Sequence, residues 1–126
     1  MNMMYECIKD SKIIHTQSEN SKEKLVKNVI DYIHQHYEKQ ITLKELADYV
    51  HISKEYLCRI FAEVSDDSPI VYLNRYRVVQ SADMLLNSHK TISEIASLCG
   101  FNSNSYFDKM FMRFVGLSPK EYRKQK

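Results

Sequence analysis

Residues 42–61 read TLKELADYVHISKEYLCRIF, and residues 91–111, TISEIASLCGFNSNSYFDKMF, repeat the same pattern. Residue types match at a separation of 49 positions from Thr42 onward and, after one inserted residue, at 50 positions from Tyr56 onward. The matched positions carry the same chemistry: a hydroxyl, an acid, an aromatic residue, a basic residue and a final Phe. The sequence therefore predicts two copies of one small structural unit.

Each copy is predicted to form two short helices joined by a tight turn. Thr42 and Glu45 match a capping box, which satisfies free N–H groups at a helix start, and the first helix follows over 43–50. Ser53 is placed to cap a second helix that runs to about Glu63. Such a pair of helices is a helix-turn-helix. In the second copy the equivalent positions are Thr91 and Glu94 for the box, Cys99-Gly100-Phe101 for the turn and Asn102 or Ser103 for the second cap.

Apolar residues recur at helical spacing in both copies and define the faces that we expect to be buried. In the first copy they are Leu43, Leu46, Ala47, Val50, Leu57, Ile60, Phe61 and Val64, and in the second Ile92, Ile95, Ala96, Cys99, Phe107, Met110, Phe111 and Phe114. The same spacing places Tyr72, Leu73, Tyr76, Val79, Ala82, Leu85 and Leu86 on the buried side of a long helix between the copies.

The rest of the chain also favours helices. Only two Gly and two Pro occur in 126 residues, which are too few turn signals for a sheet protein. Ser68-Pro69 and Ser118-Pro119 each match a helix start, with a capping hydroxyl and Pro in the first turn. We therefore expect an all-α domain over residues 21–126, with helix-turn-helix units at about 41–64 and 91–114 and a linker helix at about 69–88. Residues 1–20 are expected to be a flexible arm or the remnant of a linker.

Composition excludes several classes of protein. No apolar run is long enough to span a bilayer and no signal peptide is evident, so we expect a cytoplasmic protein without a membrane partner. There is no phosphate-binding Gly loop, carboxylate pair or activated nucleophile, so no enzyme is expected and no cofactor is called for. The three Cys residues share no ligand spacing, and His34 and His36 lie on different helix faces, so no metal site is expected.

Charge points weakly to a polyanionic partner. The net charge is only +2, but the end of the chain is basic, with Lys109, Arg113, Lys120, Arg123, Lys124 and Lys126 against Glu121 alone. A basic end suits a polyanion, and a solvated helix face produces the same pattern.

The second helix of each copy has an outward face suited to reading base edges. The outward or leading positions are Ser53, Lys54, Glu55, Cys58 and Arg59 in the first copy and Ser103, Asn104, Ser105, Asp108 and Lys109 in the second. Arg and Lys donate to guanine, and Asn pairs with adenine. Ser53 and Ser103 stand at helix amino ends, whose free N–H groups favour phosphate. We therefore expect these residues to contact double-stranded DNA.

Three of these positions have a second interpretation. Glu55 either accepts a hydrogen bond from cytosine or pairs with Arg59 one turn away, and Asp108 is open to the same two readings. Cys58 is either a small side chain in the groove or a redox sensor, and no resolving thiol lies near it in the sequence.

Residues 41–122 resemble the DNA-binding domain of the AraC/XylS family of bacterial transcription regulators. The likeness is carried by ITLKELADYVHISKEYLCRIF, YLNRYRVVQSADMLL, TISEIASLCGFNSNSYFDKMF and GLSPKEYR. It implies a seven-helix fold with two helix-turn-helix units, a cytoplasmic, nucleoid-associated location and, usually, activation through contact with RNA polymerase. It also places DNA contacts on the outward positions of both second helices.

The chain departs from the family pattern in two ways. Asp66 stands where the family usually has Gly and where the second copy has Gly116, at a helix end that favours a left-handed residue. Most members also have a separate effector or dimerisation domain. The chain is accordingly either a stand-alone member or the carboxyl-terminal part of a longer regulator that dimerises through a missing domain.

The functional prediction is a sequence-specific transcription regulator, an activator rather than a repressor. The linker helix would act as a ruler that brings two recognition helices to adjacent major-groove segments. The alternative is a module of the same fold that binds another regulator without reading DNA, which the acidic residues on both outward faces keep open.

Overall fold

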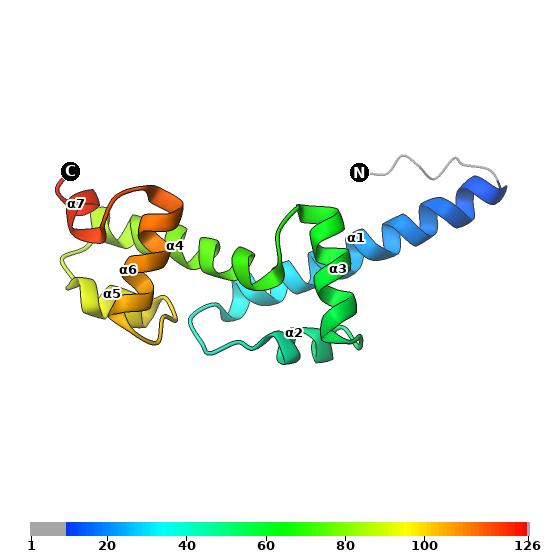
Figure 1. Ribbon diagram of the computed structural model, residues 1–126, viewed down its shortest axis with the longest axis horizontal. Helices are drawn as coiled ribbons and strands as arrows, with labels where there is room; N and C mark the ends of the chain where they lie inside the picture. The colour runs from blue at the N-terminus through cyan, green and yellow to red at the C-terminus, as the bar shows by residue number, and fades with distance from the viewer. Residues whose placement is uncertain (1–9, 126) are drawn as a thin grey trace.

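The computed structural model describes the backbone of residues 10–125 and the side chains from Ser21 onward. This part of the chain is all-α, with no strand (Figure 1). Its seven helices are α1 (Asp10–His36), α2 (Leu43–Tyr49), α3 (Lys54–Ser65), α4 (Pro69–Asn87), α5 (Ile92–Leu98), α6 (Asn104–Val115) and α7 (Pro119–Arg123). The predicted fold class is confirmed.

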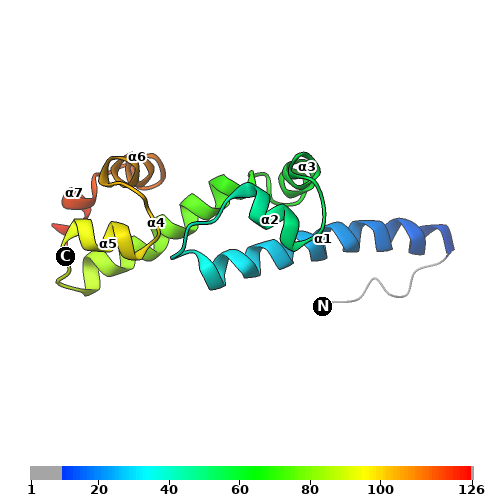
Figure 2. The same cartoon turned by 90° about the horizontal axis from the view of Figure 1, so that it is seen from below.

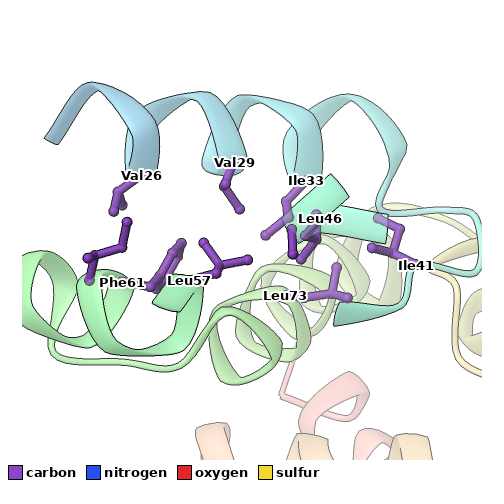
Figure 3. Packing of buried hydrophobic residues seen from close by; sticks show 10 residues of the cluster. Val26, Val29, Ile33, Ile41, Leu46, Leu57, Phe61 and Leu73 are labelled. Atoms are coloured by element: carbon purple, nitrogen blue, oxygen red, sulfur yellow. The ribbon is translucent and has the colours of Figure 1, made fainter. Parts of the chain in front are cut away.

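The first helix-turn-helix packs α2 and α3 against α1 and the start of α4. Val26, Val29 and Ile33 lie on one side of α1, because their spacing of three and four residues matches the helical repeat. Figure 3 shows these side chains pointing toward Leu57 and Phe61 of α3, and all five are at most 2% exposed. Burial of each such side chain contributes about 1.5–3 kcal/mol, so this core holds the unit together.

The second unit repeats this architecture with α4 in the place of α1. Its core contains Val78 and Leu85 of α4 and Phe107 and Phe111 of α6. The first core instead takes Leu73 from the beginning of α4. The linker helix therefore contributes its amino-terminal half to one core and its carboxyl-terminal half to the other.

Side-chain caps explain where the helices begin. Each of Ser53, Ser68, Ser103 and Ser118 accepts a hydrogen bond from the backbone N–H three residues ahead, at 3.1 Å. The open choice for the α6 cap is therefore decided for Ser103, since α6 begins at the next residue. Pro69 and Pro119 stand in the first turns of α4 and α7, as predicted.

The two predicted capping boxes differ. Thr91 and Glu94 form a complete box, since each side chain accepts from the backbone N–H of the other residue. Thr42 accepts from the Glu45 N–H at 3.0 Å, but the Glu45 carboxylate accepts from the Tyr32 hydroxyl of α1 instead of closing the box. The prediction of a full box at α2 was wrong, because a partner from another helix takes the carboxylate.

Other departures from the sequence prediction concern helix length and burial. Helix α1 begins at Asp10, inside the segment predicted to be a flexible arm over residues 1–20; residues 1–9 lie outside the described part. No Gly or Pro interrupts the chain between Asp10 and His36, so nothing in the sequence stops the helix there. The expected burial of Val64 and Val79 was wrong, since they are 40% and 56% exposed.

Left-handed residues end helices α3 and α6. Asp66 has φ 68° after α3 and Gly116 has φ 87° after α6, which confirms the predicted equivalence of these helix ends. The turns inside the two units also match, with His51 at φ 62° and Gly100 at φ 92°. The duplication thus extends to backbone geometry that the side chains alone do not reveal.

Candidate nucleic-acid interface

Helices α3 and α6 stand on the same side of the molecule. Figure 1 shows them side-on with similar directions, and Figure 2 shows both nearly along their axes, above α1 and α4. Their apolar sides are held by the two cores, through Leu57, Ile60 and Phe61 in α3 and through Phe107, Met110 and Phe111 in α6. Their opposite sides therefore face away from the scaffold.

The positions predicted to contact DNA lie on this free side or at the amino ends of α3 and α6. Ser53, Lys54, Glu55, Arg59, Ser103, Asn104, Ser105, Asp108 and Lys109 are all exposed, and Cys58 is half-buried. The structure thus divides the ten residues into two groups, one for each helix. Arg59 and Lys109 hold the same position in the two helices, because each stands three residues after the matched Tyr.

The guanidinium of Arg59 lies over an aromatic ring and forms no ion pair within residues 21–125. Its central carbon is 5.0 Å from the ring centroid of Tyr56, which is itself 36% exposed. Glu55 and Arg59 are not paired in this structure, so the carboxylate of Glu55 stays free to meet another donor. A cation–π contact of this kind is worth about 0.5–1 kcal/mol at an exposed site and leaves the guanidinium N–H groups available.

The matched ring in α6 is held in a different way. The hydroxyl of Tyr106 accepts a hydrogen bond from the Asn74 side-chain amide at 2.8 Å, so the ring is tied to α4. Asn104 donates to the Ser93 hydroxyl at 3.3 Å across the turn. Lys109 forms no ion pair among the described side chains, so its ammonium group extends free from the face of α6.

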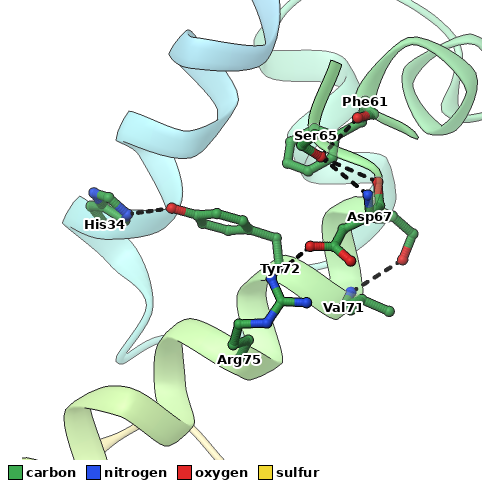
Figure 4. Close-up of polar contacts among 8 residues, drawn as sticks. His34, Phe61, Ser65, Asp67, Val71, Tyr72 and Arg75 are labelled. Atoms are coloured by element: carbon green, nitrogen blue, oxygen red, sulfur yellow. Dashed lines mark hydrogen bonds and ion pairs between the residues drawn. The ribbon is translucent and has the colours of Figure 1, made fainter. Parts of the chain in front are cut away.

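Polar residues in the middle of α4 were missed by the sequence prediction. Asn74 and Arg77 are 6% and 7% exposed, which is unusual burial for such side chains. Arg75 donates to the Asp67 carboxylate at 2.6 Å (Figure 4), and this hydrogen bond is the main reason that the pKa of Asp67 lies below its ordinary value. The available signal was NRYR at residues 74–77, a polar run between the apolar positions of a helix that packs on two cores.

The described part of the chain was also compared with the requirements of a metal site, a reactive thiol and a membrane-spanning helix. No cluster of three or more His, Cys, Asp or Glu side chains could hold a metal ion there. Cys99 is fully buried, and burial raises the pKa of its thiol to about 11, so it is a core residue as predicted. None of the helices found in residues 10–125 has the length and apolar character required to cross a membrane.

Comparison with known proteins identifies the family of this domain. A family model described as a helix-turn-helix domain matches residues 46–125, which is more than half of the chain. The chain belongs to the AraC/XylS family. AraC/XylS proteins are DNA-binding transcription regulators and not enzymes, and the two-unit fold described above is that of their DNA-binding domains.

Three relatives give the extent of the likeness. YdeC of Bacillus subtilis (strain 168), an uncharacterised helix-turn-helix transcriptional regulator, is 32% identical over 110 residues, covering 87% of this chain and 38% of YdeC. The carboxyl-terminal domain of AraT, a response regulator from Geobacillus stearothermophilus, is 30% identical with a TM-score of 0.77, covering 81% of this chain and 85% of that domain. The DNA-binding domain of AdpA, a global transcriptional factor solved with a target DNA, is 28% identical with a TM-score of 0.76, covering 79% and 90%.

The matched region is a fraction of the curated AraC/XylS relatives. The chain spans 38% of the length of YdeC and 41% of YisR, a second regulator from Bacillus subtilis. The comparisons with the AraT and AdpA structures, in contrast, cover most of both chains, because those solved structures are themselves isolated domains. The shared part is therefore the helix-turn-helix domain.

Proposed function

We propose that this domain reads double-stranded DNA for a transcription regulator, with α3 and α6 entering two adjacent major-groove segments. The observation that carries the proposal is the common face of the two helices, each buried on one side and polar on the other (Figure 2). The solved AdpA domain of the same fold, which was crystallised with a target DNA, supports it.

The linker helix sets a separation that fits this role. Helix α4 has 19 residues, which at 1.5 Å per residue gives a length of about 28 Å. Successive major-groove segments on one face of DNA lie about 34 Å apart, a similar distance. One chain would then engage both segments, whereas simpler helix-turn-helix proteins need a dimer.

We assign roles to the exposed residues from their chemistry. Arg59 and Lys109 would donate to guanine, and Asn104 would pair with adenine after releasing Ser93. Glu55 and Asp108 would accept from cytosine. Ser53 and Ser103, at the amino ends of the two helices, would lie near phosphates, where free N–H groups favour negative charge. Lys54, Cys58 and Ser105 complete the two contact surfaces.

DNA binding is tested by titrating the protein with a duplex selected from a random pool. We expect the affinity to fall by about 10²–10³-fold between 50 mM and 200 mM salt, because phosphate contacts release bound counterions. Fluorescence anisotropy at several salt concentrations gives the slope. Failure to select or bind any duplex at 50 mM salt would contradict the proposal and favour a module that binds another regulator.

Replacing Arg59 with Ala should weaken binding to the selected duplex by about 1–3 kcal/mol and relax the preference at one base position, since a guanine contact is lost. Competition with duplexes mutated at single positions measures both effects. Lys124→Ala is the control, because it removes one positive charge outside α3 and α6; its loss should be smaller and equal for all sequences. If Arg59→Ala weakened the binding to every duplex equally, Arg59 would contact phosphate only.

The regulatory outcome rests on family resemblance. AraC/XylS regulators usually activate transcription through RNA polymerase, so we propose an activator that works in the cytoplasm on the nucleoid, with RNA polymerase as its second partner. If a longer regulator dimerised through another domain, the dimer would contain two copies of this DNA-binding domain.

A further inference from the structure

We propose that Arg77 is a positioning residue that locks the two helix-turn-helix units into one rigid body, so that the spacing between the two DNA segments is fixed by a side-chain junction as well as by α4. The inference rests on the proposed function for its consequence on DNA, but the lock itself is a property of the free protein. We call the group formed by Tyr37, Gln40, Arg77, Gly100 and Phe101 the junction.

The guanidinium of Arg77 binds the end of the first unit. Its Nε donates to the Tyr37 carbonyl at 2.9 Å, and one terminal nitrogen donates to the Lys39 carbonyl at 2.7 Å. These carbonyls follow the last residue of α1, where the helix leaves backbone acceptors unpaired and carries partial negative charge. A buried guanidinium with two such acceptors is held in one geometry, because losing either bond would leave a buried donor unsatisfied.

The same guanidinium also contacts the turn of the second unit. Its carbon lies 5.9 Å from the ring centroid of Phe101. Gly100 packs so closely that a Cβ placed on it would lie 2.3 Å from the Tyr37 carbonyl oxygen and 2.8 Å from the Arg77 Nε. Gln40 donates to the Gly100 carbonyl at 3.3 Å. The backbone of the second turn therefore packs directly against the residues that follow α1, and the Arg77 guanidinium lies beside this contact.

Two neighbours of Arg77 on α4 bridge the units in parallel. Asn74 donates to the Tyr106 hydroxyl of α6, so the second recognition helix is tied to the part of α4 that belongs to the first core. Arg75 pairs with Asp67, which follows α3, and its guanidinium carbon is also 5.5 Å from the ring centroid of Phe114 in α6. Tyr37 packs against both hydrophobic cores. Rotation of one unit about α4 would break all of these contacts together.

Arg123 provides a matched comparison inside one unit. Its Nε donates to the Leu85 carbonyl at 3.0 Å and a terminal nitrogen to the Ser88 carbonyl at 3.2 Å, which is the same fork on the end of α4. Arg123 lies on α7, and both carbonyls belong to the second half of the molecule. Removing Arg123 therefore costs a similar pair of hydrogen bonds without touching the boundary between the units.

A fixed orientation between α3 and α6 would affect both the affinity for DNA and the tolerance of altered spacing. When one recognition helix is bound, the second is presented to its groove at a high effective concentration only if its orientation is already correct. Without the junction, the second helix would sample many orientations, and binding at the optimal spacing would weaken. The same freedom would let the protein accept duplexes with altered spacing.

The lock is tested on the free protein by NMR residual dipolar couplings of the α3 and α6 amides. In the unaltered protein both helices should fit one alignment tensor. Arg77→Ala should require two tensors, while Arg123→Ala should still fit one. If Arg77→Ala does not fold, Arg77→Lys, which keeps the charge and loses the fork, should require two tensors. A folded Arg77 variant that fits one tensor as well as the unaltered protein would overturn the lock.

The consequence is tested on duplexes selected by the unaltered protein, with the distance between the two contacted segments changed by one base pair. The unaltered protein should lose about 10-fold or more in affinity on the altered spacing, and Arg77→Ala only about 2–3-fold from a weaker starting point. An equally steep loss in Arg77→Ala would contradict the inference. If the unaltered protein selects no DNA, the proposed function fails, and the NMR result alone decides the lock.

Discussion

Replacing Gly100 with Ala should lower the free energy of unfolding by about 3–5 kcal/mol, because two separate costs combine at this residue. Gly100 has φ 92°, a conformation that side chains with a Cβ rarely adopt. The new methyl group would also lie 2.3 Å from the backbone oxygen of Tyr37, so either the turn or the end of α1 must move. Urea unfolding followed by circular dichroism measures the loss.

Gly116→Ala is the matched control, because it has the conformational cost without the contact. Gly116 has φ 87°, and nothing lies within 4 Å of the position that a Cβ would take. We expect a loss of about 1–2 kcal/mol there. Similar losses in the two variants would show that the end of α1 gives way easily, and that the contact at Gly100 adds little. A much larger loss at Gly100 would support a stiff boundary between the units.

The duplication explains why so much of this fold could be predicted from the sequence. Each of the two copies carries a hydroxyl residue at the start of its helices. The same helix boundaries are therefore predicted twice, independently. The turn after Ala47 illustrates this: the N–H of Ile52 bonds to the Ala47 carbonyl as the N–H of Phe101 bonds to that of Ala96. The positions of the helices and turns depend on local hydrogen bonds and helical periodicity, so they can be predicted from neighbouring residues in the sequence.

Contacts between distant parts of the chain could not be predicted in the same way. The Glu45 carboxylate was expected to close a capping box three residues away, but Tyr32 reaches it from α1. Arg77 was part of a long helix in the sequence prediction, and its partners Tyr37 and Lys39 lie 40 and 38 positions away. Periodicity shows that a residue is buried but not what it meets, so polar partners across the core remained hidden.

The outward faces of α3 and α6 were predicted because burial on one side of a helix determines what is left on the other. Once Leu57 and Phe61 are assigned to the core, Glu55 and Arg59 must lie on the opposite side of α3, whereas Lys54 is exposed at its amino end. The prediction of exposure is confirmed in α3 and α6 for every position except Cys58, which is half-buried, whereas the contacts with DNA remain a proposal. The contact of Arg59 with Tyr56 was not predicted, since the sequence offered only Glu55 as a possible partner of Arg59 on its own helix.

Replacing Gln80 with Pro should abolish binding to two groove segments, with an affinity loss of about 100-fold or more. Gln80 lies inside α4, between Leu73 of the first core and Leu85 of the second. Proline removes one helical hydrogen bond and its ring clashes with the preceding turn, at a cost of about 3 kcal/mol or more. The preceding turn holds Arg77, so the kink would disturb the junction as well.

The kink should separate the two units, because the helical hydrogen bond that proline removes joins residue 80 to residue 76, where α4 passes from Leu73 of the first core to Val78 of the second. Each core has its own aromatic anchor, since Phe61 packs against Tyr72 in the first core and Phe111 against Tyr122 in the second. Footprinting on the selected duplex should then show protection of one segment or none, while Gln80→Ala, which keeps the helix, protects both. Protection of both segments by a folded Gln80→Pro variant would mean that α4 does not set the spacing between α3 and α6. That result would contradict the proposed two-groove geometry.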